Sequence, residues 1–222
     1  HKGLGSVAER NFRPHVNCVN ITPDQKYLCA VDLGVDQVKI YKFNYETGKI
    51  TLMDMLRCEQ ESAPRIIKFS PDGRFAYLIC ELKNYISVYS YKDGPRGPIF
   101  ELVQTISTLN DYHSKGSAAC VLRFSRDWNY VLCSNAGDNS IGIFKVDHET
   151  GMLEKICILP ISGDYPKAAD FFPDNRHIMS LNHETNTMTI FKINYEKKYF
   201  SMWGKPLKVE TPNCILVSEI QG

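Results

Sequence analysis

Short apolar runs separated by turns recur along the whole chain. In residues 63–89, apolar runs at Ile66–Phe69, Phe75–Cys80 and Ile86–Tyr89 flank the turn Pro71-Asp72-Gly73 and a second, shorter turn. Proline fixes φ at the first central position of a turn and glycine accepts a positive φ, so this stretch predicts strand, turn, strand, short turn, strand. Because no stretch has helical periodicity, the pattern predicts an all-β chain.

The strand–turn–strand unit repeats. Its turn recurs about 50 residues apart, as Thr22-Pro23-Asp24, Ser70-Pro71-Asp72, Ser125-Arg126-Asp127 and Phe172-Pro173-Asp174. When the units are aligned on this turn, a second turn column holds Asp36, Asn84, Asn139 and Asn186, and an apolar strand column holds Tyr41, Tyr89, Phe144 and Phe191. Four short strands in each such unit are typical of a β-propeller blade. A β-sandwich would not repeat so regularly, and an α/β fold needs helices.

We therefore expect a β-propeller built from four-stranded antiparallel blades. The blades are expected at residues 15–60, 63–112, 117–163 and 165–209, and residues 211–220 are expected to form the first strand of a further or shared blade. Four blades and a fraction rarely close a ring. We interpret the chain as the C-terminal part of a larger propeller, whose partner would be the remaining blades or a second copy of itself.

Composition narrows the function classes. The net charge is +1, from 26 basic and 25 acidic residues, so the chain predicts neither a nucleic-acid partner nor a membrane-surface face. No apolar run approaches the ~18 residues of a spanning helix, and no signal peptide is visible. The eight cysteines form no C-x-x-C pair and no zinc-type spacing with histidine. These observations predict a reduced, cytoplasmic protein without a metal or cofactor.

Two other columns of the repeat mix polar, charged and apolar residues. At the start of the inner strand, the column contains Asn17, Arg65, Cys120, Lys167 and Asn213. At the end of the second strand, it contains Leu33, Glu81, Ala136 and His183. A column with a purely structural role usually has similar residue types in every repeat. In a propeller, such positions tend to gather at one mouth of the central channel, so both columns are candidate binding positions.

The charged members of these columns have definite chemistry. Arg65 and Lys167 could hold a phosphate or carboxylate, Arg65 through its planar fork, or could simply pair with a neighbouring loop. Glu81 follows an apolar run, where a half-buried carboxylate could act as a general base or acid; the alternative is a solvated residue at a turn. His183 could transfer protons or be structural.

Two remaining segments are open to more than one interpretation. His15 lies two residues before Asn17, and it either faces the channel or packs. The segment Asp32–Asp36 has two carboxylates, and it is interpreted as a loop in which they bond the backbone; the alternative is that they bind a ligand.

Several of these segments together resemble a known family. They are Pro14-His15-Val16-Asn17, Val31-Asp32-Leu33-Gly34-Val35-Asp36, Pro64-Arg65, Ser70-Pro71-Asp72-Gly73-Arg74-Phe75-Ala76-Tyr77, Glu81-Leu82 and Ser134-Asn135-Ala136-Gly137. They resemble the lactonase family of seven-bladed β-propellers, which includes bacterial 6-phosphogluconolactonases and fungal carboxymuconate-lactonising enzymes. The resemblance implies that about three N-terminal blades are absent from this sequence. It also implies that Arg65 and Glu81 match family site positions. The family has His where this chain has Asn17, and commonly Arg where it has Ala136.

The resemblance implies a lactonase-like hydrolase acting on a sugar-derived or carboxylated lactone. Arg65 would hold an anionic group of the substrate or polarise the lactone carbonyl, and Glu81 would activate water or protonate the leaving ring oxygen. Further substrate-binding residues at the same mouth would be His15, Asn17, Lys167 and His183. The alternative is a non-catalytic propeller that binds a small ligand or a protein, which the departures at Asn17 and Ala136 favour. Lactone formation or isomerisation is a third possibility.

Overall fold

The computed structural model describes residues 1–5, 13–113 and 115–218. The chain divides into two compact units, residues 1–106 and 107–222. In the described part, strands form nearly all of the regular structure, and no α-helix is present. None of the described helical segments is long and apolar enough to cross a membrane.

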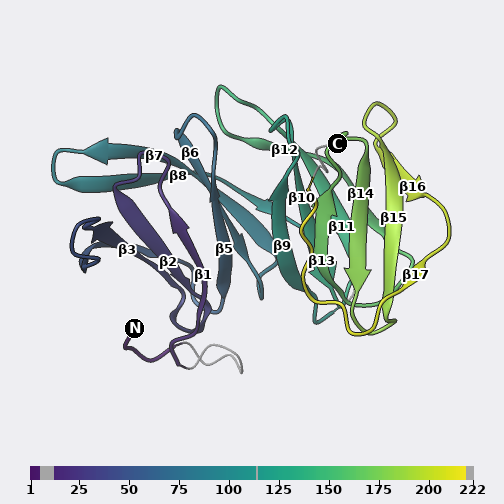
Figure 1. The fold of residues 1–222 in the computed structure, drawn as a ribbon, viewed down its shortest axis with the longest axis horizontal. Coiled ribbons are helices and arrows are strands. Elements are labelled where there is room, and N and C mark those ends of the chain that lie inside the picture. The colour runs from purple at the N-terminus through teal and green to yellow at the C-terminus, as the bar shows by residue number, and fades with distance from the viewer. Residues whose placement is uncertain (6–12, 114, 219–222) are drawn as a thin grey trace. The chain divides into compact units, whose positions relative to one another are not determined.

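The first unit contains two antiparallel sheets whose strands follow chain order (Figure 1). The strands of the first sheet are β1 (Val16–Ile21), β2 (Tyr27–Asp32), β3 (Gln37–Phe43) and β4 (Ile50–Arg57), with the 3-10 turn η1 (Leu33–Val35) after β2. Those of the second sheet are β5 (Pro64–Phe69), β6 (Phe75–Cys80), β7 (Tyr85–Gly94) and β8 (Gly97–Ser107). The strands predicted in residues 63–89 thus correspond to β5, β6 and the first half of β7.

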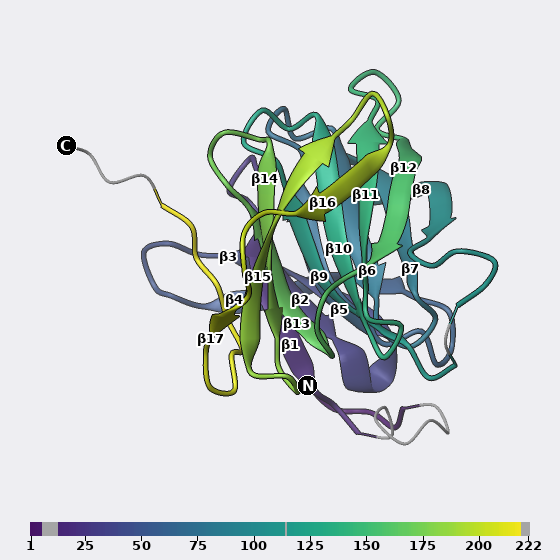
Figure 2. The same cartoon turned by 90° about the vertical axis from the view of Figure 1, so that its right-hand side faces the viewer.

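The second unit repeats this plan. Its first sheet contains β9 (Ala118–Phe124), β10 (Tyr130–Ala136), β11 (Ser140–Val146) and β12 (Leu153–Pro160). Its second contains β13 (Pro166–Phe171), β14 (His177–Asn182), β15 (Thr187–Asn194) and β16 (Tyr199–Met202), and the short β17 (Leu207–Lys208) also pairs with β15 (Figure 2). Four consecutive sheets of this kind confirm the prediction of four-stranded antiparallel blades.

The second turn column has a common backbone conformation. The residues between the second and third strands of each sheet have φ of 52°, 53°, 53° and 54°, at Asp36, Asn84, Asn139 and Asn186 respectively. Asn and Asp tolerate this left-handed conformation better than other residues with a Cβ. The sequence column therefore reflects a backbone requirement of the hairpin.

The turns between the first and second strands of each sheet are closed by their own side chains. The hydroxyls of Thr22, Ser70 and Ser125 each donate to the aspartate two residues later, at 2.6 Å. The fourth turn begins with Phe172, which has no hydroxyl; there the imidazole of His177 bonds Asp174 at 2.6 Å instead.

The left-handed residues of the second turn column also bond the segment that follows their own sheet. Asp36 accepts from the amide of Ala63 at 2.8 Å, and Asn139 accepts from the amide of Tyr165 at 2.8 Å. Asn186 makes the equivalent bond to the amide of Thr211, at 2.7 Å. Residues 211–218 form no strand, and residues 219–222 lie outside the described part, so the predicted strand at 211–220 stays a prediction.

Candidate active site

Four of the five residues in the first candidate column are β-bulge residues, and the fifth, Asn213, lies outside any strand. In β1 the register skips Asn17, since Val16 and Cys18 pair with consecutive residues of β2. The register skips Arg65, Cys120 and Lys167 in the inner strands of the next three sheets in the same way. A bulge leaves one residue outside the ladder, bends the strand and re-aims the side chain. The column is variable because these side chains are not required by the sheet.

Arg65 and Glu81 form an ion pair. Nη1 of Arg65 donates to Oε2 of Glu81, and their side chains are 23% and 3% exposed. Glu81 follows β6, and its amide donates to the carbonyl of Ala63 at 2.8 Å. The carboxylate is therefore buried, not half-buried or solvated as the sequence suggested. A charge in such a position requires a partner, and Arg65 provides it.

Asn17 connects the first sheet to this pair. Its Nδ2 donates to the backbone carbonyl of Arg65 at 3.2 Å. Asn20, three residues later on β1, donates in the same way to the carbonyl of Ile67 at 3.1 Å. Asn17, Arg65 and Glu81 thus form one connected group within the first unit. The sequence analysis did not identify Asn20, although its position on the same strand as Asn17 was a usable signal.

His15 contributes its backbone rather than its side chain. Its amide donates to Oδ1 of Asp32 at 2.7 Å, and the side chain is exposed. Asp32 is fully buried and also accepts from the amide of Gly34 and from Nδ1 of His1, at 3.1 and 2.5 Å. The interpretation of Asp32 as a backbone-bonding carboxylate is therefore confirmed, and the contact with His1 is an addition that the sequence did not indicate.

Lys167 and His183 occupy the matching backbone positions in the second unit. Lys167 is the bulge residue of β13 and is partly exposed. His183 follows β14, and its amide donates to the carbonyl of Tyr165 at 3.0 Å, as the amide of Glu81 does to Ala63. Its Nδ1 lies 3.2 Å from the carbonyl oxygen of Pro212. A carbonyl can only accept, so Nδ1 carries the proton.

The structure therefore brings together some of the predicted residues. Asn17, Arg65 and Glu81 are linked by hydrogen bonds. A shared mouth that also includes Lys167 and His183 stays a prediction, because those two residues belong to the other unit. In β9 and β10, the equivalent Cys120 and Ala136 are 5% and 0% exposed and carry no charge.

Two cysteines of the first unit, Cys58 and Cys80, have raised thiol pKa values. Burial raises the pKa of Cys80 to about 12 and places the pKa of Cys58 well above its ordinary value. Protonated thiols are poor nucleophiles and metal ligands at neutral pH. The chain's eight cysteines are free, and the described residues contain no group of three or more His, Cys, Asp and Glu suited to a metal. The chemistry of this group therefore rests on a guanidinium, a carboxylate and a carboxamide.

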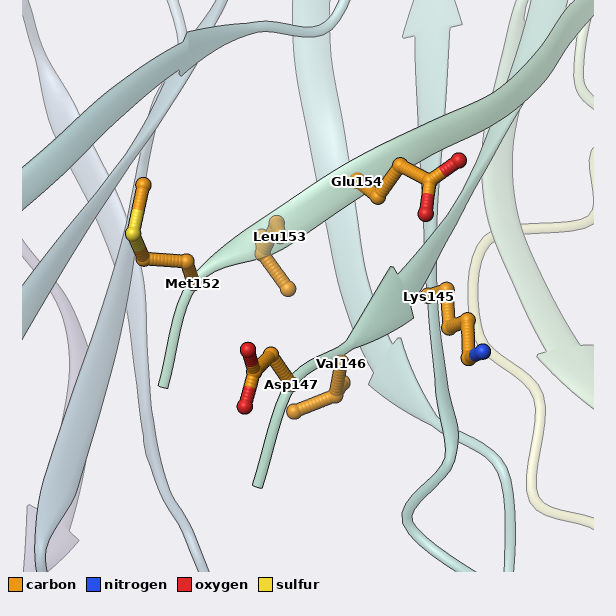
Figure 3. A pocket seen from close by; sticks show the side chains of 6 residues that line it. All are labelled: Lys145, Val146, Asp147, Met152, Leu153 and Glu154. Carbon is orange, nitrogen blue, oxygen red and sulfur yellow. The ribbon is translucent and has the colours of Figure 1, made fainter. Parts of the chain in front are cut away.

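A surface depression of about 460 Å³ lies elsewhere, on the hairpin between β11 and β12 (Figure 3). It is lined by Lys145, Val146, Asp147, Met152, Leu153 and Glu154. Backbone bonds from Glu149 and Thr150 lower the pKa of Asp147, whose carboxylate closes the hairpin turn. This depression is a by-product of the turn and contains none of the predicted site residues.

Comparison with known proteins identifies the family to which the repeat belongs. The profile of the family described as "Lactonase, 7-bladed beta-propeller" matches residues 1–217. The chain belongs to this lactonase family. Its resemblance to the family, first seen in the motifs around Arg65 and Glu81, is thereby confirmed.

Individual relatives agree with this assignment. The chain is 27% identical over 215 residues to 6-phosphogluconolactonase of Bacillus subtilis, covering 97% of this chain and 60% of that protein. It is 35% identical to an uncharacterized protein of Lactococcus lactis, covering 97% and 62%. The solved structure of the periplasmic gluconolactonase of Pseudomonas aeruginosa superposes with a TM-score of 0.87 at 26% identity, covering 96% and 60%. The chain thus spans about three fifths of the length of these relatives.

Proposed function

We propose that the protein is a lactone hydrolase acting on a sugar-derived or carboxylated lactone. The observation that carries the proposal is the ion pair between the buried Glu81 and the partly exposed Arg65 at a β-bulge, in a chain of the lactonase family. A bulge that re-aims a side chain is over-represented next to active sites. The names of the relatives support an ester of this ring type as substrate.

The two side chains divide the chemistry between them. A guanidinium has five N–H donors, so Arg65 can bond Glu81 and a substrate oxygen at once. Its charge stabilises the negative oxygen that develops when water adds to the lactone carbonyl. Glu81 takes a proton from the attacking water as the new C–O bond forms. It then returns that proton to the ring oxygen as the old C–O bond breaks, and the product is the open hydroxy acid.

Replacing Glu81→Gln in the whole protein tests the proposal. Glutamine keeps the shape and an acceptor for Arg65 but cannot take a proton at neutral pH, so kcat for glucono-δ-lactone should fall by about 100-fold or more. Base uptake at constant pH measures the rate. Glu59→Gln is the matched control, because Glu59 is an exposed carboxylate of the same unit that pairs with Lys83. Unchanged hydrolysis in the Glu81 variant would show that the mechanism is wrong.

A non-catalytic propeller is the rival function. It is favoured by the closed Arg65–Glu81 pair and by Ala136, which is fully buried and offers no polar group. A rise in melting temperature with lactone or hydroxy acid, in a wild-type protein that hydrolyses no lactone, would establish this rival. If the protein instead forms or isomerises a lactone, a new lactone should accumulate when the protein is incubated with the hydroxy acid or with an isomeric lactone.

We also propose that a further blade covers the outer face of β1. Val16, Val19 and Ile21 are 43%, 55% and 43% exposed there, whereas the matching Ile67 and Phe69 of β5 are 0% and 7% exposed. Apolar rows of this kind pack against a neighbouring sheet in the rest of the repeat. Without a covering blade, the chain should self-associate through this face. Light scattering should then show oligomers that Val19→Lys disrupts; a monomeric wild-type chain would contradict this.

The predicted cytoplasmic location stays a prediction, and one similar structure is named periplasmic.

A further inference from the structure

The outer strand of the second sheet, β8, lies at an open sheet edge. It is the last strand in the order β5-β6-β7-β8, so no described strand pairs with its outer side (Figure 1). β8 has 11 residues, whereas the outer strands β4, β12 and β16 have 8, 8 and 4. The backbone groups along such an edge can pair with an incoming strand. Among the described strands, β8 therefore offers the longest edge for pairing.

The other three outer strands have features that discourage edge pairing. The register skips Met53 in β4 and Ile156 in β12, so each contains a β-bulge, and β12 ends at Pro160. β16 is short. Bulges, proline, charged side chains and short length are the usual protections of an edge strand. In β8, residues 102–107 have the sequence Leu-Val-Gln-Thr-Ile-Ser, with neither a proline nor a charge.

Apolar side chains are exposed on both faces of β8. Leu102 and Val103 are 60% and 38% exposed. Successive side chains of a strand point to opposite faces of the sheet, so these two lie on different faces. A strand added to this edge would form cross-strand side-chain pairs with both residues. The edge of β8 thus combines open length with apolar contact surface.

The charge pattern of β8 suits pairing with a second copy of itself. Two identical strands that pair antiparallel are related by a two-fold axis, and each presents the same residues to the other. Glu101 is the single charged residue in the sequence of β8. With the axis at any of residues 102–104, Glu101 lies opposite an uncharged residue of the copy, which is Val103, Thr105 or Ser107. Like charges directly opposite each other would oppose pairing, and this arrangement has none.

We propose that the protein forms a two-fold dimer in which β8 of one copy pairs antiparallel with β8 of a second copy. The two four-stranded sheets then become one continuous sheet. This interface uses neither the Arg65–Glu81 pair nor the outer face of β1, so it is independent of the proposed activity and of a covering blade. A single strand pair buries less surface than a permanent interface, so the dimer should be weak and should depend on concentration.

Sedimentation velocity of the whole protein over a range of concentrations tests the dimer. Leu102→Lys should raise its dissociation constant by at least about tenfold, because each substitution acts twice in a two-fold interface. Leu52→Lys is the matched control: Leu52 is 50% exposed on the outer strand β4, and its substitution should leave the dimer unchanged. A protein that is monomeric at every concentration would overturn the inference. So would an association that Leu102→Lys does not weaken, which is the result expected for contact through the outer face of β1.

Amide hydrogen exchange of the wild type tests strand pairing without any substitution. As the concentration rises, exchange should slow at alternate amides of residues 99–107, because the amides that point away from β7 gain carbonyl partners in the second copy. The amides of β4 should exchange at the same rate throughout. A dimer that forms without concentration-dependent protection in β8 would show that the copies meet elsewhere.

Discussion

The second and fourth sheets build the same frame and place different chemistry on it. Both have a bulge near the start of the inner strand, at Arg65 and at Lys167. In both, the residue after the second strand bonds back to the connection before the inner strand, through the amides of Glu81 and His183. In the second sheet the two side chains form a buried ion pair. In the fourth, His183 bonds the backbone of Pro212 instead.

The comparison shows that the bulge is a constant of the repeat and its side chains are not. The ladder on either side of the bulge holds the backbone, so Arg, Lys, Asn or Cys can stand at this position without changing the sheet. The charge at the bulge position can therefore differ from one sheet to the next. Removing a side chain should be costly where it neutralises a buried partner, and cheap where it does not.

The largest expected difference is in stability. Arg65→Leu removes the guanidinium partner of a carboxylate that is 3% exposed, and should lower the free energy of unfolding by about 3 kcal/mol. Lys167→Leu, at the matching bulge, should cost less than about 1 kcal/mol, because no ion pair of Lys167 is found among the described residues. Urea unfolding measures both. Equal losses would contradict the distinction, and Arg65→Leu combined with Glu81→Leu should recover most of the loss.

A smaller effect is expected at His183. Removing its side chain with His183→Ala deletes one neutral hydrogen bond, to Pro212, and should cost about 1 kcal/mol. The loss should be local, seen as faster amide exchange in residues 211–218. His183→Asn, which can keep a donor near the Nδ1 position, should restore part of the protection. The prediction is wrong if exchange in this segment is the same in the wild type and the alanine variant.

The smallest effect concerns the turns and depends on pH. Partial burial opposes ionisation of Asp72, but bonds from Ser70 and Arg74 outweigh it and lower the pKa of Asp72 to about 2. Since the folded pKa is below the unfolded value, the stabilisation is present above about pH 4 and is lost as the pH falls towards 2. Asp72→Asn should therefore lower the free energy of unfolding, measured by urea, slightly at pH 7, by under about 1 kcal/mol for this exposed group, and hardly at all at pH 2. A pH-independent gap would exclude the ionised carboxylate as the cause.

Much of the fold could be predicted from local patterns. The turns closed by a hydroxyl and an aspartate follow from residues that bond one another within a few positions. The left-handed positions such as Asn139 follow from a residue type that tolerates a positive φ. The sequence also singled out Arg65 and Glu81 as candidate site residues, because both stand at variable positions of the same blade. Their degree of burial was not, since it depends on how the neighbouring sheet covers them.

The amino-acid sequence by itself determined the repeat and the four-stranded blades, because turn chemistry and strand alternation are local and recur about every 50 residues. The family followed from the resemblance of particular motifs, and the family profile confirms it. Only the tertiary structure decided what the variable columns do. A bulge is a register mismatch between two strands, so it is not visible in either strand alone. The link from Asn17 to the carbonyl of Arg65 joins residues 48 positions apart in neighbouring sheets, and its geometry exists only once those sheets pack.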